Sequence, residues 1–331
     1  KPLSFLTFTA RVGTDAYNTN SNQIYAIGSL GDDPQTGKGQ INNASTNFRN
    51  LYTDLLLKFN KELTKDIGFN GLVGYNMNYT ETQFLFSRGR TLQIPEYNNL
   101  NNATELYASN TASYQKTNSI FVDAAFDFKR MLYLTLTGRN EWSTSYGKNG
   151  KRFFFPKADI SWVFSETVKM PAWFTFGKIR AAYSKVGISP SVYSDRTYYT
   201  VPFFTDGSTN GNTLPYIGQS GFAISNTLGN GKLVAETVTG LETGLDLRFF
   251  KGRLTLDFTA YHQTSNNLLI SQPVAASSGY VARQVNAGSL VNKGIEVALG
   301  IEIIQTEKFN WNLTTKITKK ISKVTKLTNG V

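Results

Sequence analysis

Residues 252–262 read Gly-Arg-Leu-Thr-Leu-Asp-Phe-Thr-Ala-Tyr-His, and this stretch decides the fold class. One phase of a two-residue repeat is apolar and carries Leu254, Leu256, Phe258 and Ala260. The other phase is polar or charged and carries Arg253, Thr255, Asp257, Thr259 and Tyr261. A side-chain period of two predicts a β-strand with one apolar face and one polar face.

The same alternation recurs along the chain, at residues 67–79, 120–128, 132–142, 154–164, 241–249, 295–303 and 309–317. Each segment predicts a strand of about ten residues. Strands in globular proteins usually have about five or six residues, whereas about ten residues of tilted strand cross a bilayer. We therefore predict an all-β fold, a transmembrane antiparallel β-barrel.

The connections between these segments are alternately short and long. The short ones are Lys65-Asp66, Lys129-Arg130, Lys251-Gly252 and residues 305–307, and the long polar ones cover about residues 18–46, 93–117, 187–233 and 265–290. Tight periplasmic turns and long extracellular loops are typical of a transmembrane barrel. A soluble sandwich or propeller is the alternative interpretation, and a β-solenoid is disfavoured because no fixed short repeat occurs.

One face of nearly every predicted strand is apolar, and the other is charged. The charged face carries Asp123, Asp127, Arg139, Glu141, Asp159, Glu242, Asp246, Arg248, Arg253, Asp257, Glu296 and Glu302. A charge at the bilayer midplane costs on the order of 2–4 kcal/mol, so these residues are expected to face a wet interior. Because both signs occur, we predict cross-strand pairs, which either hold the wall together or contact substrate.

Aromatic residues gather near the predicted strand ends: Phe153, Phe154, Phe155, Trp162, Trp173, Phe174, Phe249, Phe250, Tyr261, Phe309 and Trp311. Rings at strand ends fit girdles at the level of the lipid headgroups, and a stacking platform for sugars or bases is the alternative.

Composition excludes several kinds of site. The 331 residues include no Cys and one His, His262, so no disulfide scaffold, cysteine zinc site or cysteine nucleophile can form within them. No phosphate loop or dinucleotide fingerprint occurs, and no stretch of about 18 apolar residues predicts a membrane helix. Adjacent Asp32 and Asp33 are weak evidence for calcium. We predict no enzymatic activity, no metal and no cofactor.

The formal net charge is +11, but the basic residues form no stripe of the kind that binds nucleic acid. The exception is a run at the end of the chain: Lys316, Lys319, Lys320, Lys323 and Lys326. A solvated loop base or attraction to an anionic outer leaflet explains this run more simply, so no nucleic-acid partner is predicted.

Four longer motifs resemble one family. Residues 138–144 read Gly-Arg-Asn-Glu-Trp-Ser-Thr, and residues 154–166, 177–187 and 285–297 follow in matching order and spacing. Together they resemble the C-terminal barrel half of SusC/RagA-type TonB-dependent outer-membrane transporters. The Asn-Pro-x-Leu-Lys-Pro-Glu-like stretch usual in that family is altered at residues 229–237, where Leu233 and Glu236 are kept but neither Pro nor the Lys that follows the Leu is present.

The resemblance implies a barrel of about 22 strands, to which this chain contributes about twelve. Residues 1–331 would be a partial barrel domain, with the plug domain and the remaining strands absent from this chain. Residues 1–10 already show a strand pattern, so we interpret the chain as a piece of a longer protein. An open sheet in lipid leaves unpaired backbone groups at both edges, each costing several kcal/mol, so missing strands are expected to close it.

The resemblance also implies a function in the bacterial outer membrane, the import of oligosaccharides or peptides. The implied partners are a SusD-like surface lipoprotein lid, the TonB system acting through the absent plug, outer-membrane lipid with lipopolysaccharide, and a second barrel copy. Candidate lid or ligand contacts are Tyr198, Tyr199, Phe203 and Phe204, in the loop 187–233. A structural subunit of an outer-membrane assembly or secretion machine, or a passive porin, stays open as an alternative.

Overall fold

The computed structural model describes residues 3–29, 37–147, 152–201, 203–204, 212–214 and 216–327. Eleven long strands form the main sheet: β1 (Leu6–Tyr25), β2 (Gln40–Glu62), β3 (Ile67–Leu92), β4 (Ala103–Phe128), β5 (Leu132–Ser143), β6 (Arg152–Trp162), β7 (Phe174–Ile188), β13 (Glu236–Phe249), β14 (Leu254–Asn266), β17 (Ser289–Gln305) and β18 (Asn310–Lys326).

Short elements fill the connections of the described chain. The short strands are β8 (Tyr199–Thr200), β9 (Phe203–Phe204), β10 (Asn212–Thr213), β11 (Ala223–Ile224), β12 (Thr227–Leu228), β15 (Leu269–Pro273) and β16 (Ala282–Asn286). Single turns of 3-10 helix are η1 (Leu100–Asn102), η2 (Thr144–Tyr146), η3 (Phe164–Glu166), η4 (Phe250–Gly252) and η5 (Ala276–Ser278). None of these described helices is long and apolar enough to cross a bilayer.

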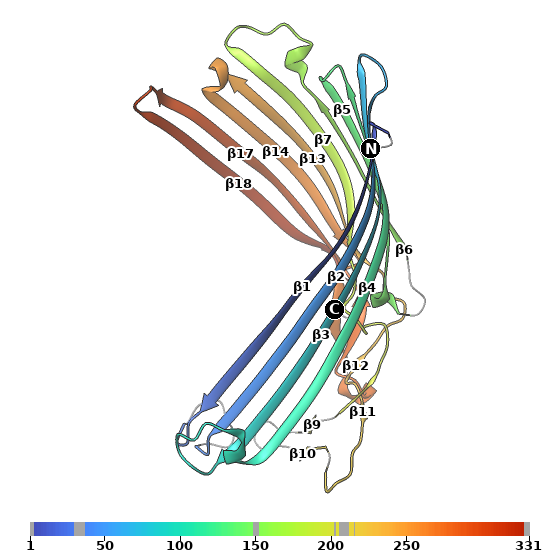
Figure 1. Cartoon of the computed structure of the whole chain (residues 1–331), viewed down its shortest axis with the longest axis vertical. Coiled ribbons are helices and arrows are strands. Elements are labelled where there is room, and N and C mark those ends of the chain that lie inside the picture. The colour runs from blue at the N-terminus through green and yellow to red at the C-terminus, as the bar shows by residue number, and fades with distance from the viewer. Residues whose placement is uncertain are drawn as a thin grey trace.

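The main sheet is antiparallel throughout, and its strands follow one another in chain order from β1 to β18. The sheet is strongly curved and open, with β1 at one edge and β18 at the other (Figure 1). Each strand between these two edges pairs with its predecessor and its successor in the sheet, as in an up-and-down meander. The all-β antiparallel prediction is confirmed, with eleven strands in the sheet against about twelve expected.

The strands are longer than predicted, so two of the predicted loops were too long. β1 runs to Tyr25 and β2 starts at Gln40, which reduces the loop 18–46 to residues 26–39. β4 starts at Ala103, which reduces the loop 93–117 to residues 93–102. The two later loops lie close to their predicted positions, at residues 189–235 and 267–288, although both contain short strands.

The extra strand length is built from polar residues. Asn18 donates to Asn47 at 2.5 Å and Asn22 donates to Asn43 at 2.6 Å, each across the β1–β2 ladder. Such side chains pair well on a sheet but are polar on both phases. They therefore carry no hydrophobic period from which a strand could be predicted.

The predicted short turns are confirmed, and they share one end of the sheet, the upper end in Figure 1. The β4–β5 turn shows how tight they are. Lys129 and Arg130 both take positive φ, 50° and 56°, and the N–H of Met131 donates to the carbonyl of Phe128. Two successive residues with positive φ are typical of a type I′ turn. Phe128 directly opposes Leu132, so only three residues connect the two strands.

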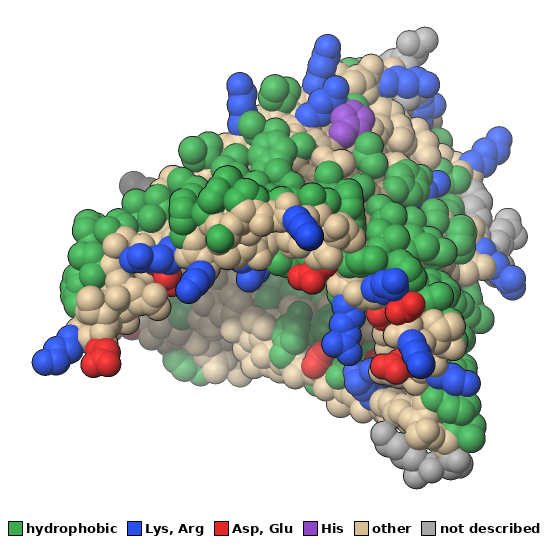
Figure 2. Space-filling model, turned by 90° about the horizontal axis from the view of Figure 1, so that it is seen from above, with side chains coloured by type: hydrophobic (Ala, Val, Ile, Leu, Met, Phe, Trp, Pro, Cys, Tyr) green, Lys and Arg blue, Asp and Glu red, His purple; other side chains and the backbone are tan. Residues whose placement is uncertain are grey.

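The two faces of the sheet separate by chemistry. Leu247, Leu256 and Leu299 are directly opposed on three neighbouring strands and lie on the outer, apolar face. Asp246 and Asp257 oppose each other one position away, on the inner face. Hydrophobic side chains cover the outside of the curved sheet, and acidic and basic side chains gather along the hollow (Figure 2). The predicted alternation of faces is confirmed.

Aromatic rings form a continuous cluster on the short-turn end. Trp162, Phe164, Trp173, Phe174, Phe249 and Phe250 are joined by ring contacts with centroids 5.1–6.4 Å apart. Three other residues were wrongly assigned to a girdle. Phe153, Phe155 and Tyr261 share the phase of inner-face charges, because Phe155 opposes Arg139 and Tyr261 opposes Glu242.

The sheet is a single layer, so its buried residues do not form one central core. Within the described chain, buried apolar side chains sit mainly where loops return to the sheet. Examples are Ile41 and Leu92 at one loop base, and Leu233, Ala235 and Ala287 at another. Most large apolar side chains of the strands are instead exposed or half-buried, as expected for a surface that meets lipid.

Candidate functional site

The inner face is built from rows of directly opposed residues that cross the sheet. One row joins Asp127, Tyr133, Ser161, Arg180, Gly244, Thr259, Glu296 and Thr318. The next row joins Lys178, Asp246, Asp257, Ala298 and Lys316. These rows carry both signs of charge across β7, β13, β14 and β17, so the wall is suited to zwitterionic or hydroxyl-rich molecules as well as to its own ion pairs.

Arg180 links three strands of this wall. Its guanidinium lies 3.4 Å from each carboxylate oxygen of Asp257 and donates to the Thr259 hydroxyl at 2.6 Å. Asp257 directly opposes Asp246, and two like charges in that position repel each other. Arg180, which pairs with Asp257, and Arg248, which contacts Asp246 at 3.9 Å, offset that repulsion. Arg180 was not predicted from the sequence. It alternates with Ile179 and shares the phase of Lys178, and this pattern indicates a charged face.

Other ion pairs of the inner face run along single strands. Arg139 contacts Glu141 at 2.9 Å and Lys157 contacts Asp159 at 3.2 Å, each between residues two apart on one strand. The prediction of cross-strand pairs is thus right for Arg180 and Asp257, whereas these two pairs follow the strand. Half-exposed ion pairs of this kind contribute roughly 0–1 kcal/mol each to folding stability. A ligand could therefore separate such a pair and bind one of its charges at little cost.

Glycines on the inner face let large side chains lie flat against the wall. A Cβ on Gly74 would collide with the ring of Phe121, and a Cβ on Gly294 would collide with the hydroxyl of Tyr261. Gly244 takes the same role beneath Arg180. Because these side chains lie over glycines, they occupy less of the hollow than they would over a larger neighbour.

Gly294→Ala should therefore lift Tyr261 off the wall and destabilise the folded protein by about 1–3 kcal/mol. Gly240→Ala is the matched control, because a Cβ there meets its nearest atom at an ordinary 3.5 Å. Denaturant unfolding of the full-length protein in detergent measures both losses. Adding Tyr261→Ala to Gly294→Ala should remove most of the loss, and an unchanged loss would contradict the packing described.

The connection of residues 189–235 folds back over the long-loop end of the sheet. The Tyr114 N–H of β4 donates to the Tyr193 hydroxyl at 3.2 Å, across 79 residues of sequence. Asp195 and Arg196 form an ion pair at 2.9 Å, and hydrogen bonding to Asp195 raises the pKa of Arg196. The Asn230 N–H donates to the carbonyl of Ser194, so the two ends of this connection are held together.

Asn286 anchors the connection to the sheet. Its side-chain oxygen accepts from the Val234 N–H at 2.8 Å, and its amide donates at 2.9 Å to the carbonyls of Val234 and Asn267. Sequence reasoning quoted Asn286 only as part of a motif and missed this role. The two family-matching residues lie at the same place, since Leu233 is buried and Glu236 accepts from the Leu269 N–H.

The predicted contact residues occupy the same connection. Tyr198 and Tyr199 are 52% and 72% exposed, at the point where β8 pairs with β11. The backbone of Phe203 and Phe204 forms β9, paired with β10, and their side chains lie outside the described residues. The structure brings the two tyrosines to an exposed surface at the long-loop end, and their contact with a lid or ligand stays a prediction.

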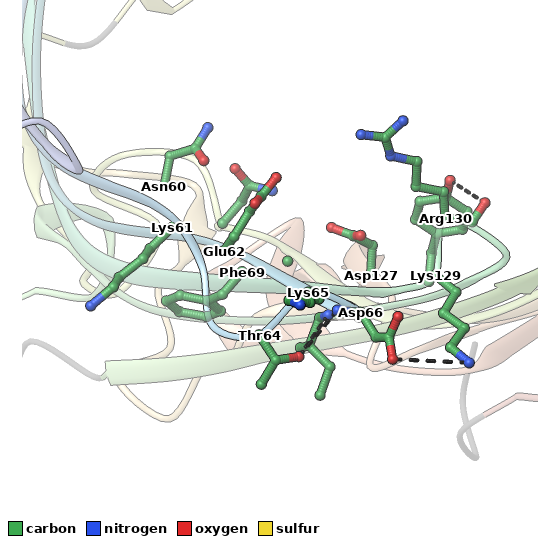
Figure 3. A pocket seen from close by; sticks show the side chains of 14 residues that line it. Asn60, Lys61, Glu62, Thr64, Lys65, Asp66, Phe69, Asp127, Lys129 and Arg130 are labelled. Atoms are coloured by element: carbon green, nitrogen blue, oxygen red, sulfur yellow. Dashed lines mark hydrogen bonds and ion pairs between the residues drawn. The ribbon is translucent and has the colours of Figure 1, made fainter.

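A recess lies at the opposite, short-turn end of the sheet. It has a volume of about 570 Å³ and lies between the β2–β3 and β4–β5 turns. Asp66 and Lys129 line it and form an ion pair, with the ammonium nitrogen 3.9 Å from a carboxylate oxygen (Figure 3). Asp127 and Arg130 also line it, so the recess is polar and charged of both signs.

The structure assigns no metal chemistry to the described residues, in which no three His, Asp or Glu side chains are placed to share an ion. The weak calcium candidates, Asp32 and Asp33, lie outside the described residues. His262 shares the outer phase of Phe258 and opposes Leu241 and Lys293. It is exposed on the outer face, as predicted for an interface position.

The chain resembles several known proteins. Its residues 3–328 match the family model described as TonB dependent receptor-like, beta-barrel. It is 28% identical over 298 residues to TonB-dependent receptor P26 of Formosa agariphila, covering 86% of this chain and 29% of that protein. It is 27% identical over 201 residues to TonB-dependent receptor SusC of Bacteroides thetaiotaomicron, covering 59% of this chain and 19% of that protein.

Solved structures share the fold. The RagAB peptide transporter matches with a TM-score of 0.84 and 20% identity, over 100% of this chain and 36% of that chain. The outer membrane transporter YddB of Escherichia coli matches with a TM-score of 0.63 and 13% identity, over 97% of this chain and 40% of that chain. The chain thus spans between 19% and 40% of the length of these proteins. The resemblance to SusC/RagA-type transporters is confirmed, and the chain belongs to the TonB-dependent receptor-like β-barrel family of the outer membrane.

Proposed function

We propose that this chain is part of the barrel of a SusC-like transporter that imports oligosaccharides or peptides across the outer membrane. The observation that carries the proposal is the inner wall, where rows of both charge signs face a hollow and apolar residues face outward. A wall that carries charges of both signs stays hydrated and can form hydrogen bonds or ion pairs with the molecules that move along it. It is therefore compatible with both oligosaccharides and peptides. Family members are transporters rather than enzymes, and a related structure is that of a peptide transporter.

The proposal includes further parts of a longer protein. A plug, a TonB-contacting segment and further strands would complete a barrel of about 22 strands. The short-turn end, with its recess at Asp66 and Lys129, would face the periplasm. The long-loop end, with residues 189–235, would face outward and meet a SusD-like lipoprotein lid.

Uptake measured with and without TonB tests this function. Cells that express the full-length protein should take up fluorescent oligosaccharides or peptides, and deletion of TonB should abolish that uptake. Ion conductance of the purified protein without TonB would instead indicate a passive porin. Stable co-purification with secretion factors, with uptake unaffected by deletion of this protein, would indicate a structural subunit.

The exposed tyrosines of the long connection supply a sharper prediction. Tyr198→Ala combined with Tyr199→Ala should weaken binding of the lid lipoprotein or ligand about tenfold or more, because exposed aromatics dominate such interfaces. Tyr97→Ala is the control, since Tyr97 is 47% exposed in a different loop. Affinity measured by surface plasmon resonance on detergent-solubilised protein reports the change. Equal affinities for the double variant and the control would remove these tyrosines from the contact.

A further inference from the structure

The lysines near the end of the chain divide between the two faces of β18. Lys316 and Lys320 oppose Ala298 and Gly294, so they lie on the inner face. Lys319 and Lys323 oppose Ile295 and Val291, so they lie on the outer face with Ile317 and Ile321. The sequence run therefore contains two separate charged groups, and only the inner one lines the hollow.

The outer group continues onto the neighbouring strands. Lys293 directly opposes Ile321 on β18 and His262 on β14, which places it diagonally between Lys319 and Lys323. Diagonal neighbours on one face lie about 7–8 Å apart. Among the described residues no ion pair involves Lys293, Lys319 or Lys323. Figure 2 shows the histidine on the outside of the sheet, with basic side chains beside it.

The position of this basic patch (Lys293, Lys319, Lys323 and His262) along the strand matches a membrane boundary. Trp311 lies at the short-turn end of β18, and Lys319 and Lys323 follow it by eight and twelve residues. At about 3.3 Å per residue and a tilt of about 40°, those steps rise roughly 20–30 Å. The apolar band of an outer-membrane barrel is about 25 Å tall, so the patch lies at the headgroup level opposite Trp311.

We propose that the basic patch binds the phosphate groups of a phosphorylated glycolipid in the outer leaflet. Three ammonium groups within one patch repel each other, and an anion between them removes that repulsion. Lysine is a point-charge donor suited to phosphate oxygens. Inorganic phosphate shares this chemistry, but Ile295, Ile317 and Val297 lie directly below the patch on the same face and would contact acyl chains.

Matched variants on the two faces of β18 test the proposal. Lys319→Gln with Lys323→Gln removes two outer charges, and Lys316→Gln with Lys320→Gln removes two inner charges from the same strand. Native mass spectrometry of the full-length protein in detergent would titrate phosphorylated lipid A, its dephosphorylated form and inorganic phosphate. The outer variant should bind phosphorylated lipid A about 10- to 30-fold more weakly, and the inner variant within about twofold of the parent.

Three results would overturn the proposal: equal affinities for the two double variants, equal binding of dephosphorylated lipid by the parent, or inorganic phosphate bound as tightly as the lipid. The shift in gel mobility on heating establishes that each variant is a folded barrel. If the outer double variant does not fold, Lys293→Gln alone replaces it, with an expected loss of about fivefold. No loss in the folded single variant would then count against the proposal.

Discussion

Leu299→Arg should destabilise the folded protein in a bilayer by about 2–4 kcal/mol. Leu299 lies on the outer face in register with Leu256 and Thr315, within the band between the aromatic end and the basic patch. An arginine there places a charge against hydrocarbon. Ala298→Arg, one residue away, places the same charge on the inner face, opposite Asp257 and Lys316.

The inner variant should lose less than about 1 kcal/mol, because the new guanidinium faces the hollow and finds Asp257 beside it. Equilibrium unfolding of the full-length protein in lipid vesicles, followed by tryptophan fluorescence, measures both losses. The two variants introduce the same side chain one residue apart on the same strand. The main difference between them is therefore the face of the sheet on which the arginine lies. An equal loss in the two variants would mean that the faces do not meet different solvents.

Asn286→Ala should release the connection of residues 189–235 from the sheet. The substitution removes three hydrogen bonds and leaves the N–H and carbonyl of Val234 without their partner. Unsatisfied backbone groups at a partly buried site cost about 1–3 kcal/mol each, so we expect a local loss of about 2–4 kcal/mol. Local opening of this size should raise the rate of protease cleavage within the connection at least about tenfold.

Two further variants separate the clamp from a general loss of stability. Asn286→Asp keeps an acceptor for the Val234 N–H but loses both donated bonds, so its cleavage rate should be intermediate. Asn292→Ala removes an amide of the same motif that accepts from Ser322 at 2.6 Å, away from the connection. Cleavage mapped by mass spectrometry should change little for Asn292→Ala. Equal cleavage in all three variants would contradict the clamp.

The parts of the fold predicted from sequence are those set by hydrophobic period. Leu254, Leu256 and Phe258 lie on one face and Thr255 and Asp257 on the other, as their phase requires. The distal halves of β1 to β4 were missed because Asn, Thr and Ser on both phases show no such period. Tyr261 was assigned to a girdle because it is aromatic, although its phase with Asp257 places it inside.

The site was less predictable because its contacts depend on register. Arg180 reaches Asp257 across β13 only because Gly244 lies between them, and residues 180, 244 and 257 carry no joint signal in the sequence. Asn286 bonds to Val234, 52 residues earlier, through loop geometry of the same kind. The sequence motifs contain Arg180 and Asn286, but the residues to which these side chains bond are known only once the strands are paired.

The central claim is that the outer face of this sheet meets lipid and the inner face meets water. The 331 residues contain no cysteine, so single cysteines introduced at residues 254–261 of β14, in a full-length protein whose other cysteines are replaced, each carry the one nitroxide label. Electron paramagnetic resonance of the full-length protein in vesicles then compares relaxation by oxygen, which concentrates in lipid, with relaxation by a water-soluble nickel chelate. We predict that oxygen relaxes the label more than the nickel chelate does at residues 254, 256, 258 and 260. At residues 255, 257, 259 and 261 the nickel chelate should relax the label more. Equal accessibility to both reagents along the strand, or the opposite phase, would contradict the account.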